Sequence, residues 1–182
     1  MSDTVKTEFK DGILLLTLNR PEKKNAFTKQ QWHAAAAQLY AARENDDVIV
    51  VVLTGAGKDF SAGQDLSESG SRGDKPPYQV MEEAVIAFDK PLIGAAKGVA
   101  VGGGATILFH CDILYVGESL RMRMPFVTLG IAPEFASTYM LQANIGARRA
   151  AELMFTAEWI DADRAVETGI ATRKYGDDEL LR

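Results

Sequence analysis

Three short apolar runs constrain the fold of this chain more than any other feature. They are residues 13–18, 48–54 and 91–96. A strand without a polar face must be covered on both sides, which is typical of a mostly parallel sheet between helices. Segments at helical spacing separate the runs, so the order predicts an α/β protein with right-handed crossovers between parallel strands.

Local signals place the other elements. Residues 5–10 are expected to pair with 13–18 through a turn at Asp11–Gly12. Thr28 is expected to cap a helix, with Gln31 three residues later completing a capping box. The remaining expected elements are helices at 78–88, 135–145, 147–155 and 161–167, a strand at 112–116, an extended segment at 121–125 and a mobile loop, rich in Ser, Gly and Pro, at 67–78.

Composition limits the class of protein. The 182 residues carry 47% hydrophobic and 25% charged side chains and a net charge of −5, which suits a single domain spanning 1–182. No basic cluster indicates nucleic-acid binding, and no apolar run approaches the ~20 residues of a membrane span. Without an apolar leader at the start, we expect a cytoplasmic protein. A helical pattern begins near residue 177, so we expect the natural chain to continue beyond Arg182 with further helices.

A glycine-rich stretch at 97–109 is the strongest candidate for a site. It follows the run at 91–96 and places three glycines, 102–104, before an apolar helical pattern. A helix N-terminus carries unpaired N–H groups and a positive dipole end, which suit an anion or an oxygen that becomes anionic. The same glycines also suit close packing of a helix on a sheet, and both interpretations stay open at this point.

Several familiar chemistries are excluded. The phosphate-binding loop, the dinucleotide fingerprint and the serine-hydrolase elbow are all absent from the sequence. His33 and His110 lie far apart and have no partner at metal-binding spacing, so no metal site is predicted. His33 is expected on the polar side of its helix, and His110 with Cys111 is expected to form a buried structural pair.

Two loops of amide donors and a few acids remain. Ala62 and Gly103 follow different strands, and two such N–H groups converging on one oxygen would form an oxyanion hole. Glu134 lies among apolar neighbours, which would favour its neutral form and make it a better base. The alternative is an acid in a helix first turn that the dipole stabilises. The alternative acids are Asp65, Asp112 and Glu118. Of these, Asp65 is expected to fix its own loop and Asp112 to cap the end of the glycine helix.

Three motifs together resemble the crotonase (enoyl-CoA hydratase/isomerase) superfamily. They lie at residues 19–27, 60–66 and 97–104, and their order and spacing match along nearly the whole chain. The resemblance implies a spiral of ββα units with mostly parallel sheets flanked by helices. It also implies an acyl-CoA substrate, no separate cofactor since coenzyme A enters with the substrate, and a homotrimer or dimer of trimers.

The resemblance also assigns residues. It implies that the amides of Ala62 and Gly103 bind the thioester oxygen. Residues implied to line the coenzyme A path are Lys24, Ala26, Ser61, Gly63, Gln64, Asp65 and Leu66. Apolar residues expected to exclude water and line the acyl pocket include Phe126, Leu129 and Phe135.

Departures from the family pattern indicate the reaction. The two glutamates that activate water in hydratases correspond here to Thr106 and Phe126. Because a positioned general base is worth about 10²–10⁴ in rate, the loss of both glutamates argues against efficient hydration. The segment 125–134 is similar to that of peroxisomal-type Δ3,Δ2-enoyl-CoA isomerases, in which one glutamate at the Glu134 position moves the proton. The resemblance therefore implies an isomerase of fatty acid metabolism. A hydratase with displaced acids, another acyl-CoA enzyme of this fold and a non-catalytic acyl-CoA-binding protein remain as alternatives.

Overall fold

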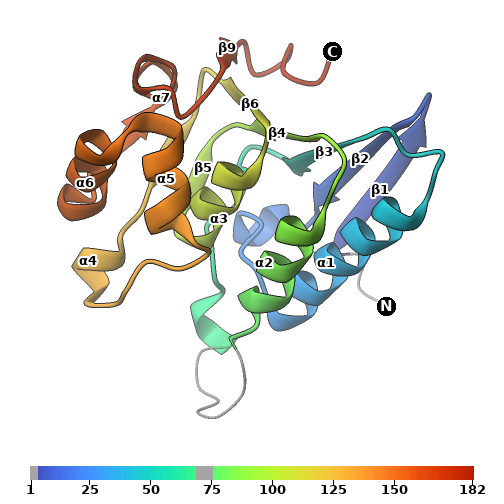
Figure 1. The fold of residues 1–182 in the computed structure, drawn as a ribbon, viewed down its shortest axis with the longest axis horizontal. Helices are drawn as coiled ribbons and strands as arrows, with labels where there is room; N and C mark the ends of the chain where they lie inside the picture. Colours follow the sequence, from blue (N-terminus) through green and yellow to red (C-terminus); the bar gives the residue numbers. More distant parts are fainter. Residues whose placement is uncertain (1–3, 69–75) are drawn as a thin grey trace.

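A six-stranded sheet lies at the centre of the computed structural model, which describes residues 4–68 and 76–182 (Figure 1). Its strand order is β1–β2–β3–β4–β6–β9, and every neighbouring pair is parallel except β1 and β2. The strands are β1 (Val5–Lys10), β2 (Ile13–Leu18), β3 (Val50–Gly55), β4 (Leu92–Ala96), β6 (Ile113–Gly117) and β9 (Arg173–Tyr175). The antiparallel pair is the hairpin predicted across Asp11–Gly12.

A second, three-stranded sheet alternates with the first along the chain. It contains β5 (Val99–Val101), β7 (Arg121–Arg123) and β8 (Ile160–Asp161) in the order β5–β7–β8. The chain passes from β4 to β5 and later from β6 to β7, and helical segments follow each step. Two strands and a helical segment per turn confirm the predicted spiral of ββα units with mostly parallel sheets.

Helices pack against these sheets and carry much of the core. In Figure 1, α1 and α2 lie side by side across the larger sheet, while α4, α5 and α6 gather at the other end of the molecule. The helices are α1 (Lys29–Glu44), α2 (Tyr78–Ala87), α3 (Gly103–Thr106), α4 (Phe126–Leu129), α5 (Ser137–Ile145), α6 (Ala147–Thr156) and α7 (Ala162–Thr168). Short 3₁₀ helices are η1 (Pro21–Lys23), η2 (Leu66–Glu68) and η3 (Ile107–His110).

The helix start predicted from the sequence is partly confirmed at α1. The Thr28 hydroxyl accepts a hydrogen bond from the Gln31 amide at 3.1 Å, so the predicted cap is present. The Gln31 side chain does not return to Thr28: its Oε1 accepts no hydrogen bond within the described residues, and its Nε2 donates to the Thr4 carbonyl at 2.9 Å. The predicted capping box is therefore only half formed, and its second half ties α1 to the chain before β1.

Several expectations from the sequence differ from the structure. The strands β5, β8 and β9 and the helix α4 were not predicted. The run at 13–18 is not covered on both faces, since Ile13 is 46% exposed beside a hollow of about 550 Å³ on the sheet. Residues 69–75 of the predicted loop lie outside the described residues. Among those that are described, no helix has the length and apolar character needed to cross a membrane.

Candidate active site

Backbone hydrogen bonds bring the two glycine-containing loops together. After β3, residues 60–61 run alongside β5: the Ser61 amide donates to the Val99 carbonyl at 2.9 Å, and the Val101 amide donates to the Ser61 carbonyl at 3.0 Å. The Phe60 amide donates to the Lys97 carbonyl at 2.8 Å. The sequence could show only that both loops follow strands; the structure shows that they converge.

The triple glycine forms a tight turn between β5 and α3. Gly102 has φ +54° and ψ −124°, a conformation that an L side chain rarely adopts. Gly103 begins α3, and among the described residues its amide has no hydrogen-bond acceptor. A Cβ at Gly103 would lie 3.0 Å from Glu134 Oε1 and 3.2 Å from Trp32 Cζ2. The missing side chain therefore lets the carboxyl group lie directly against the turn.

The first loop supplies a different amide from the one predicted. The Ala62 amide donates to the Lys24 carbonyl at 2.9 Å, so it is not free to bind a ligand oxygen, and this prediction for Ala62 is wrong. The Gln64 amide, two residues later, has no acceptor within the described part of the chain. Gly63, between them, has φ +85°, and a Cβ there would lie 3.3 Å from the Gly103 amide nitrogen. Gln64 is therefore the available donor on this loop.

Glu134 lies in the turn that precedes α5. Because α5 begins at Ser137, the carboxyl is outside the first helical turn, and the predicted alternative of a dipole-stabilised acid does not hold. Burial, together with a smaller contribution from the nearby charge of Glu82, raises the pKa of Glu134 to about 7. A carboxyl with this pKa can both accept and release a proton near neutral pH.

Helix α2 provides polar groups that face this carboxyl. Burial raises the pKa of the Tyr78 phenol, and the charges of Glu134 and Glu82 act in the same direction. Tyr78 and Glu82 are four residues apart, so they share one face of α2. Sequence reasoning did not identify either residue, although their spacing on a predicted helix was visible.

A cluster of aromatic rings lies beside the candidate site. Trp32 stacks on Phe27 with ring centroids 3.6 Å apart, and Phe135 lies 5.9 Å from Trp32. The Trp32 indole N–H donates to Gln64 Oε1 at 2.8 Å, which fixes the Gln64 side chain beside its amide. Trp32 was not among the site residues predicted from the sequence.

The loops implied to line the coenzyme A path are cross-linked to each other. The Ser61 hydroxyl donates to the Asn25 carbonyl at 2.8 Å, and Arg20 forms an ion pair with Asp65 at 3.1 Å. Asp65 also accepts from the Ser67 amide and hydroxyl, which with Arg20 holds its pKa below the usual range. The expectation that Asp65 fixes its own loop is confirmed. Leu66 is 74% exposed.

Other residues singled out from the sequence have structural positions. Asp112 accepts from the Leu92 amide at 2.8 Å, so it ties β4 to β6 and does not cap the glycine helix. His33 is exposed, as predicted. Phe126 is buried in the core, whereas Leu129 is 58% exposed on α4. His110 and Cys111 are both only half-buried, so the predicted buried pair is wrong, and His110 Nε2 instead lies 2.8 Å from the Phe135 carbonyl oxygen.

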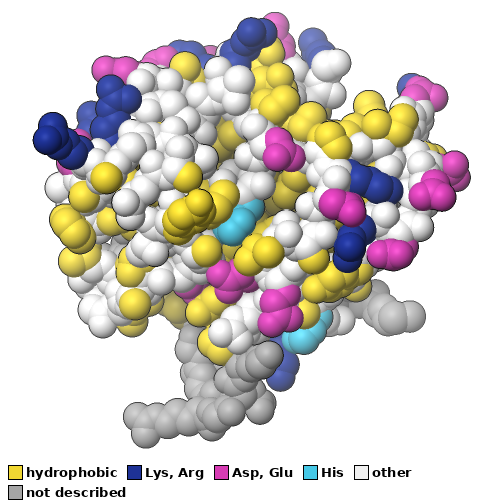
Figure 2. All heavy atoms as spheres, viewed as in Figure 1, with side chains coloured by type: hydrophobic (Ala, Val, Ile, Leu, Met, Phe, Trp, Pro, Cys, Tyr) yellow, Lys and Arg dark blue, Asp and Glu magenta, His cyan; other side chains and the backbone are white. Residues whose placement is uncertain are grey.

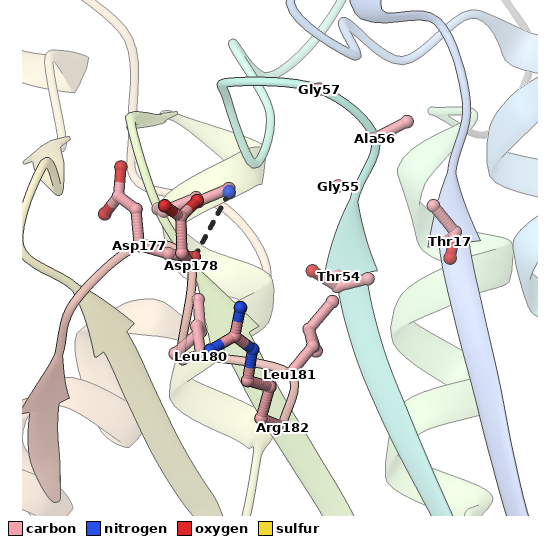
Figure 3. A pocket seen from close by; sticks show the side chains of 11 residues that line it. Thr17, Thr54, Gly55, Ala56, Gly57, Asp177, Asp178, Leu180, Leu181 and Arg182 are labelled. Atoms are coloured by element: carbon pink, nitrogen blue, oxygen red, sulfur yellow. Dashed lines mark hydrogen bonds between the residues drawn. The ribbon is translucent and has the colours of Figure 1, made fainter.

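A separate hollow of about 380 Å³ lies between the ends of β2 and β3 and the last residues of the chain (Figure 3). Lys97 Nζ at its edge donates to the Asp177 carbonyl at 3.3 Å. Its lining includes neither Gly103 nor Glu134. Within residues 4–68 and 76–182, no cluster of three or more His, Cys, Asp or Glu side chains is placed to hold a metal ion.

The fold and this site place two main-chain amides that have no acceptor among the described residues beside one buried carboxyl. The family model for enoyl-CoA hydratase/isomerase matches residues 8–182. The chain therefore belongs to the enoyl-CoA hydratase/isomerase family, within the crotonase superfamily.

Individual relatives cover most of the chain. It is 33% identical over 175 residues to 2,3-dehydroadipyl-CoA hydratase of Escherichia coli (strain K12), covering 93% of this chain and 68% of that protein. It is 33% identical over 188 residues to enoyl-CoA delta isomerase 2 of Homo sapiens, covering 96% of this chain and 47% of that protein. The solved enoyl-CoA hydratase/isomerase from Pseudoalteromonas atlantica T6c aligns with a TM-score of 0.93 at 34% identity, over 98% of this chain and 72% of that one.

Proposed function

We propose that this protein is a Δ3,Δ2-enoyl-CoA isomerase of fatty acid metabolism. The observation that carries the proposal is the position of the Glu134 carboxyl against Gly103, where a Cβ would lie 3.0 Å from Oε1. The raised pKa of Glu134 supports a group that takes and returns a proton at neutral pH. The similarity to human enoyl-CoA delta isomerase 2 lends further support.

The proposed reaction needs one base and two amide donors. The thioester oxygen of a 3-enoyl-CoA accepts hydrogen bonds from the Gly103 and Gln64 amides. Glu134 removes a proton from C2, and the electron pair of that C–H bond moves into a dienolate whose negative oxygen the amides hold. Glu134 then returns the proton to C4, which restores the carbonyl and leaves the double bond between C2 and C3. Each such amide donor is typically worth about 10²–10³ in rate.

Two further positions favour isomerisation over addition of water. Thr106 and Phe126 correspond to the hydratase glutamates, and both are buried. The Thr106 hydroxyl lies 3.5 Å from the Gly103 carbonyl, on its own helix. Neither side chain can activate water as a carboxylate does, whereas a proton shuttle within one substrate requires no water.

A second candidate function is hydration with displaced acids. Glu82 supports it, because its charge acts on Glu134 and supplies a second carboxyl at the site. Two carboxyls are the arrangement that a hydratase needs to activate and deliver water. We place this function second because the half-buried Glu82 lies on α2 and not at either position that corresponds to a hydratase glutamate.

One experiment separates the two functions. The purified protein is given 3-hexenoyl-CoA and crotonyl-CoA in parallel, and both conjugation of the double bond and loss of the conjugated thioester are followed. Isomerisation that exceeds hydration by 100-fold or more in kcat/KM supports the proposal. Hydration alone supports the second function, and binding of acyl-CoA without turnover supports a non-catalytic protein.

The assembly and location of the protein are further parts of the proposal. We propose a cytoplasmic homotrimer, or a dimer of trimers, that binds acyl-CoA along the loops at 24–26 and 61–66. Exposed apolar side chains over α4, α5 and α6 support an interface there, as seen at the left of Figure 2. The largest of them are Val127, Leu129, Ile131, Tyr139 and Phe155. Light scattering of the eluting protein gives the molecular mass and tests this assembly.

A further inference from the structure

We infer that His110 is a positioning residue that holds the Glu134 carboxyl in place through the Phe135 carbonyl. The inference rests on the proposed function, because it assigns a role relative to the proposed base. His110 does not need to touch the substrate.

The turn that presents Glu134 has an unfavourable backbone. Phe135 and Ala136 have φ +58° and +48°, so two successive residues other than glycine are left-handed. In this conformation the Cβ crowds the following carbonyl oxygen, so each residue is unfavourable relative to a right-handed conformation. Such a turn persists only when its surroundings hold it, and a relaxed turn would point the carboxyl elsewhere.

His110 supplies a specific contact to this turn. Its Nε2 lies 2.8 Å from the Phe135 carbonyl oxygen. A carbonyl oxygen can only accept, so Nε2 carries the hydrogen and donates it. The imidazole also meets the Phe135 ring edge to face, with centroids 5.3 Å apart and planes at 74°. One side chain therefore holds both the backbone and the ring of the residue that follows Glu134.

The position of His110 along the chain gives this contact its consequence. His110 is the last residue of η3, which continues directly from α3, and α3 begins at Gly103. One short helical segment thus carries the proposed oxyanion donor at its start and the contact to the Glu134 turn at its end. The hydrogen bond from His110 therefore fixes the base relative to the donor.

A neighbouring hydrogen bond provides a matched control. Asn144 Nδ2, on α5, donates to the Phe109 carbonyl at 3.2 Å. This bond also holds η3, but it comes from the body of α5 and not from the turn. A purely structural role for these bonds predicts similar effects for both side chains, whereas a positioning role predicts different ones.

The experiment compares H110F, H110Q and N144A by kcat, KM and unfolding temperature. H110F keeps a ring but removes the donor, so kcat is expected to fall about 10- to 100-fold, since a displacement of about 1 Å can cost 10² in rate. KM is expected to stay within about threefold, because the donors are unchanged. H110Q keeps an N–H at similar reach and should recover kcat to within about fivefold of the wild type. N144A should lower the unfolding temperature but leave kcat within about twofold.

A second measurement does not depend on isomerase activity. The titration of Glu134 is followed by carbon NMR of glutamate-labelled protein, with E134Q for assignment. A turn released from His110 exposes the carboxyl to water, so the pKa of Glu134 in H110F should fall below that of the wild type. If the wild type does not isomerise but this pKa falls in H110F, the proposed function fails and the positioning role stands.

Other outcomes overturn the inference. It fails if folded H110F retains kcat within twofold of the wild type, if H110Q gives no recovery, or if N144A loses kcat as H110F does. Should H110F not fold, H110L removes the same donor with a smaller side chain, and the same comparison with H110Q applies.

Discussion

The loops at 60–64 and 99–103 and the turn at 134–136 face each other in the candidate site, but different interactions hold them. The loops are joined by main-chain hydrogen bonds of 2.8–3.0 Å, and Ser61 is paired with β5 as a strand would be. The turn holds a left-handed backbone closed by one main-chain bond, from the Ser137 amide to the Glu134 carbonyl at 3.1 Å. The contacts that reach it from other elements come from the side chains of Trp32, Tyr78 and His110.

This difference separates the tasks of the site. The amide donors belong to a backbone that any side chains of suitable size can maintain, so their geometry tolerates substitution except where a Cβ intrudes. The carboxyl depends on particular side chains, so its position and its pKa respond to substitution on several elements. Substitutions at the base should therefore have larger and more varied effects than substitutions on the donor loops.

The largest effect is expected at the base itself. E134Q keeps the shape of the side chain but cannot accept a proton, so kcat for 3-enoyl-CoA isomerisation should fall about 10²–10⁴-fold. Binding of a saturated acyl-CoA, measured by calorimetry, should change little because both amide donors remain. Full activity in E134Q would remove Glu134 from the mechanism.

A methyl group on the donor turn comes next. In G103A the new Cβ would lie 3.0 Å from Glu134 Oε1 and 3.2 Å from Trp32, so the carboxyl and the amide are both displaced. The expected loss in kcat is about 10²–10³, the usual worth of one oxyanion donor. G176A is the matched control, because a Cβ added at Gly176 would have its nearest neighbouring atom 3.4 Å away, at ordinary van der Waals contact. Equal activity of G103A and the wild type would contradict the proposed geometry.

The pH dependence tests the environment of the base. Glu134 must be ionised to accept a proton, and burial raises its pKa to about 7. The value of kcat/KM should therefore fall about tenfold per unit below pH 7 and level off above it. E82Q removes the second cause of the raised pKa of Glu134, so the midpoint of the profile should move to lower pH. The plateau of kcat/KM should stay within about threefold of the wild type. A midpoint near 4.5 in the wild type would show a solvated carboxyl instead.

The same pKa links activity to stability. Between about pH 4.5 and 7 the folded protein holds a proton on Glu134 that the unfolded chain has released, so the free energy of unfolding falls as pH rises through this window. Glutamine in E134Q stays neutral at every pH. The unfolding temperature of E134Q should match the wild type near pH 4 and exceed it at pH 8, as scanning calorimetry can measure.

The same contrast between backbone and side-chain control explains what could be predicted from the sequence. The hairpin at Asp11–Gly12 and the Thr28 cap are decided by neighbouring residues, so they were predictable. The approach of Ser61 to Val99 joins residues far apart in the chain and depends on strand pairing that no local pattern reveals. The choice of Gln64 over Ala62 depends on a single bond to Lys24.

The turn after Glu134 was harder still to predict. Its left-handed residues are Phe135 and Ala136, which carry no glycine signal. Burial is the main cause of the raised pKa of Glu134, and the charge that adds to it belongs to Glu82 on α2, about 50 residues earlier in the chain. The choice of Glu134 as the proposed base came from the family resemblance, while its surroundings could be described only from the structure.

The smallest effect is expected where a side chain stands beside a proposed backbone donor. Q64A leaves the Gln64 amide in place, so kcat should stay within about threefold of the wild type. The variant removes the acceptor of the Trp32 indole N–H, and a buried donor without a partner costs about 1–3 kcal/mol of unfolding free energy. Urea unfolding and steady-state kinetics measure the two effects separately.

W32F in the Q64A background removes the indole donor that has lost its acceptor, so it should recover part of the unfolding free energy. A loss of kcat in Q64A as large as in G103A would instead show that the Gln64 side chain itself acts on the thioester, and that the donor loop depends on side chains as the Glu134 turn does.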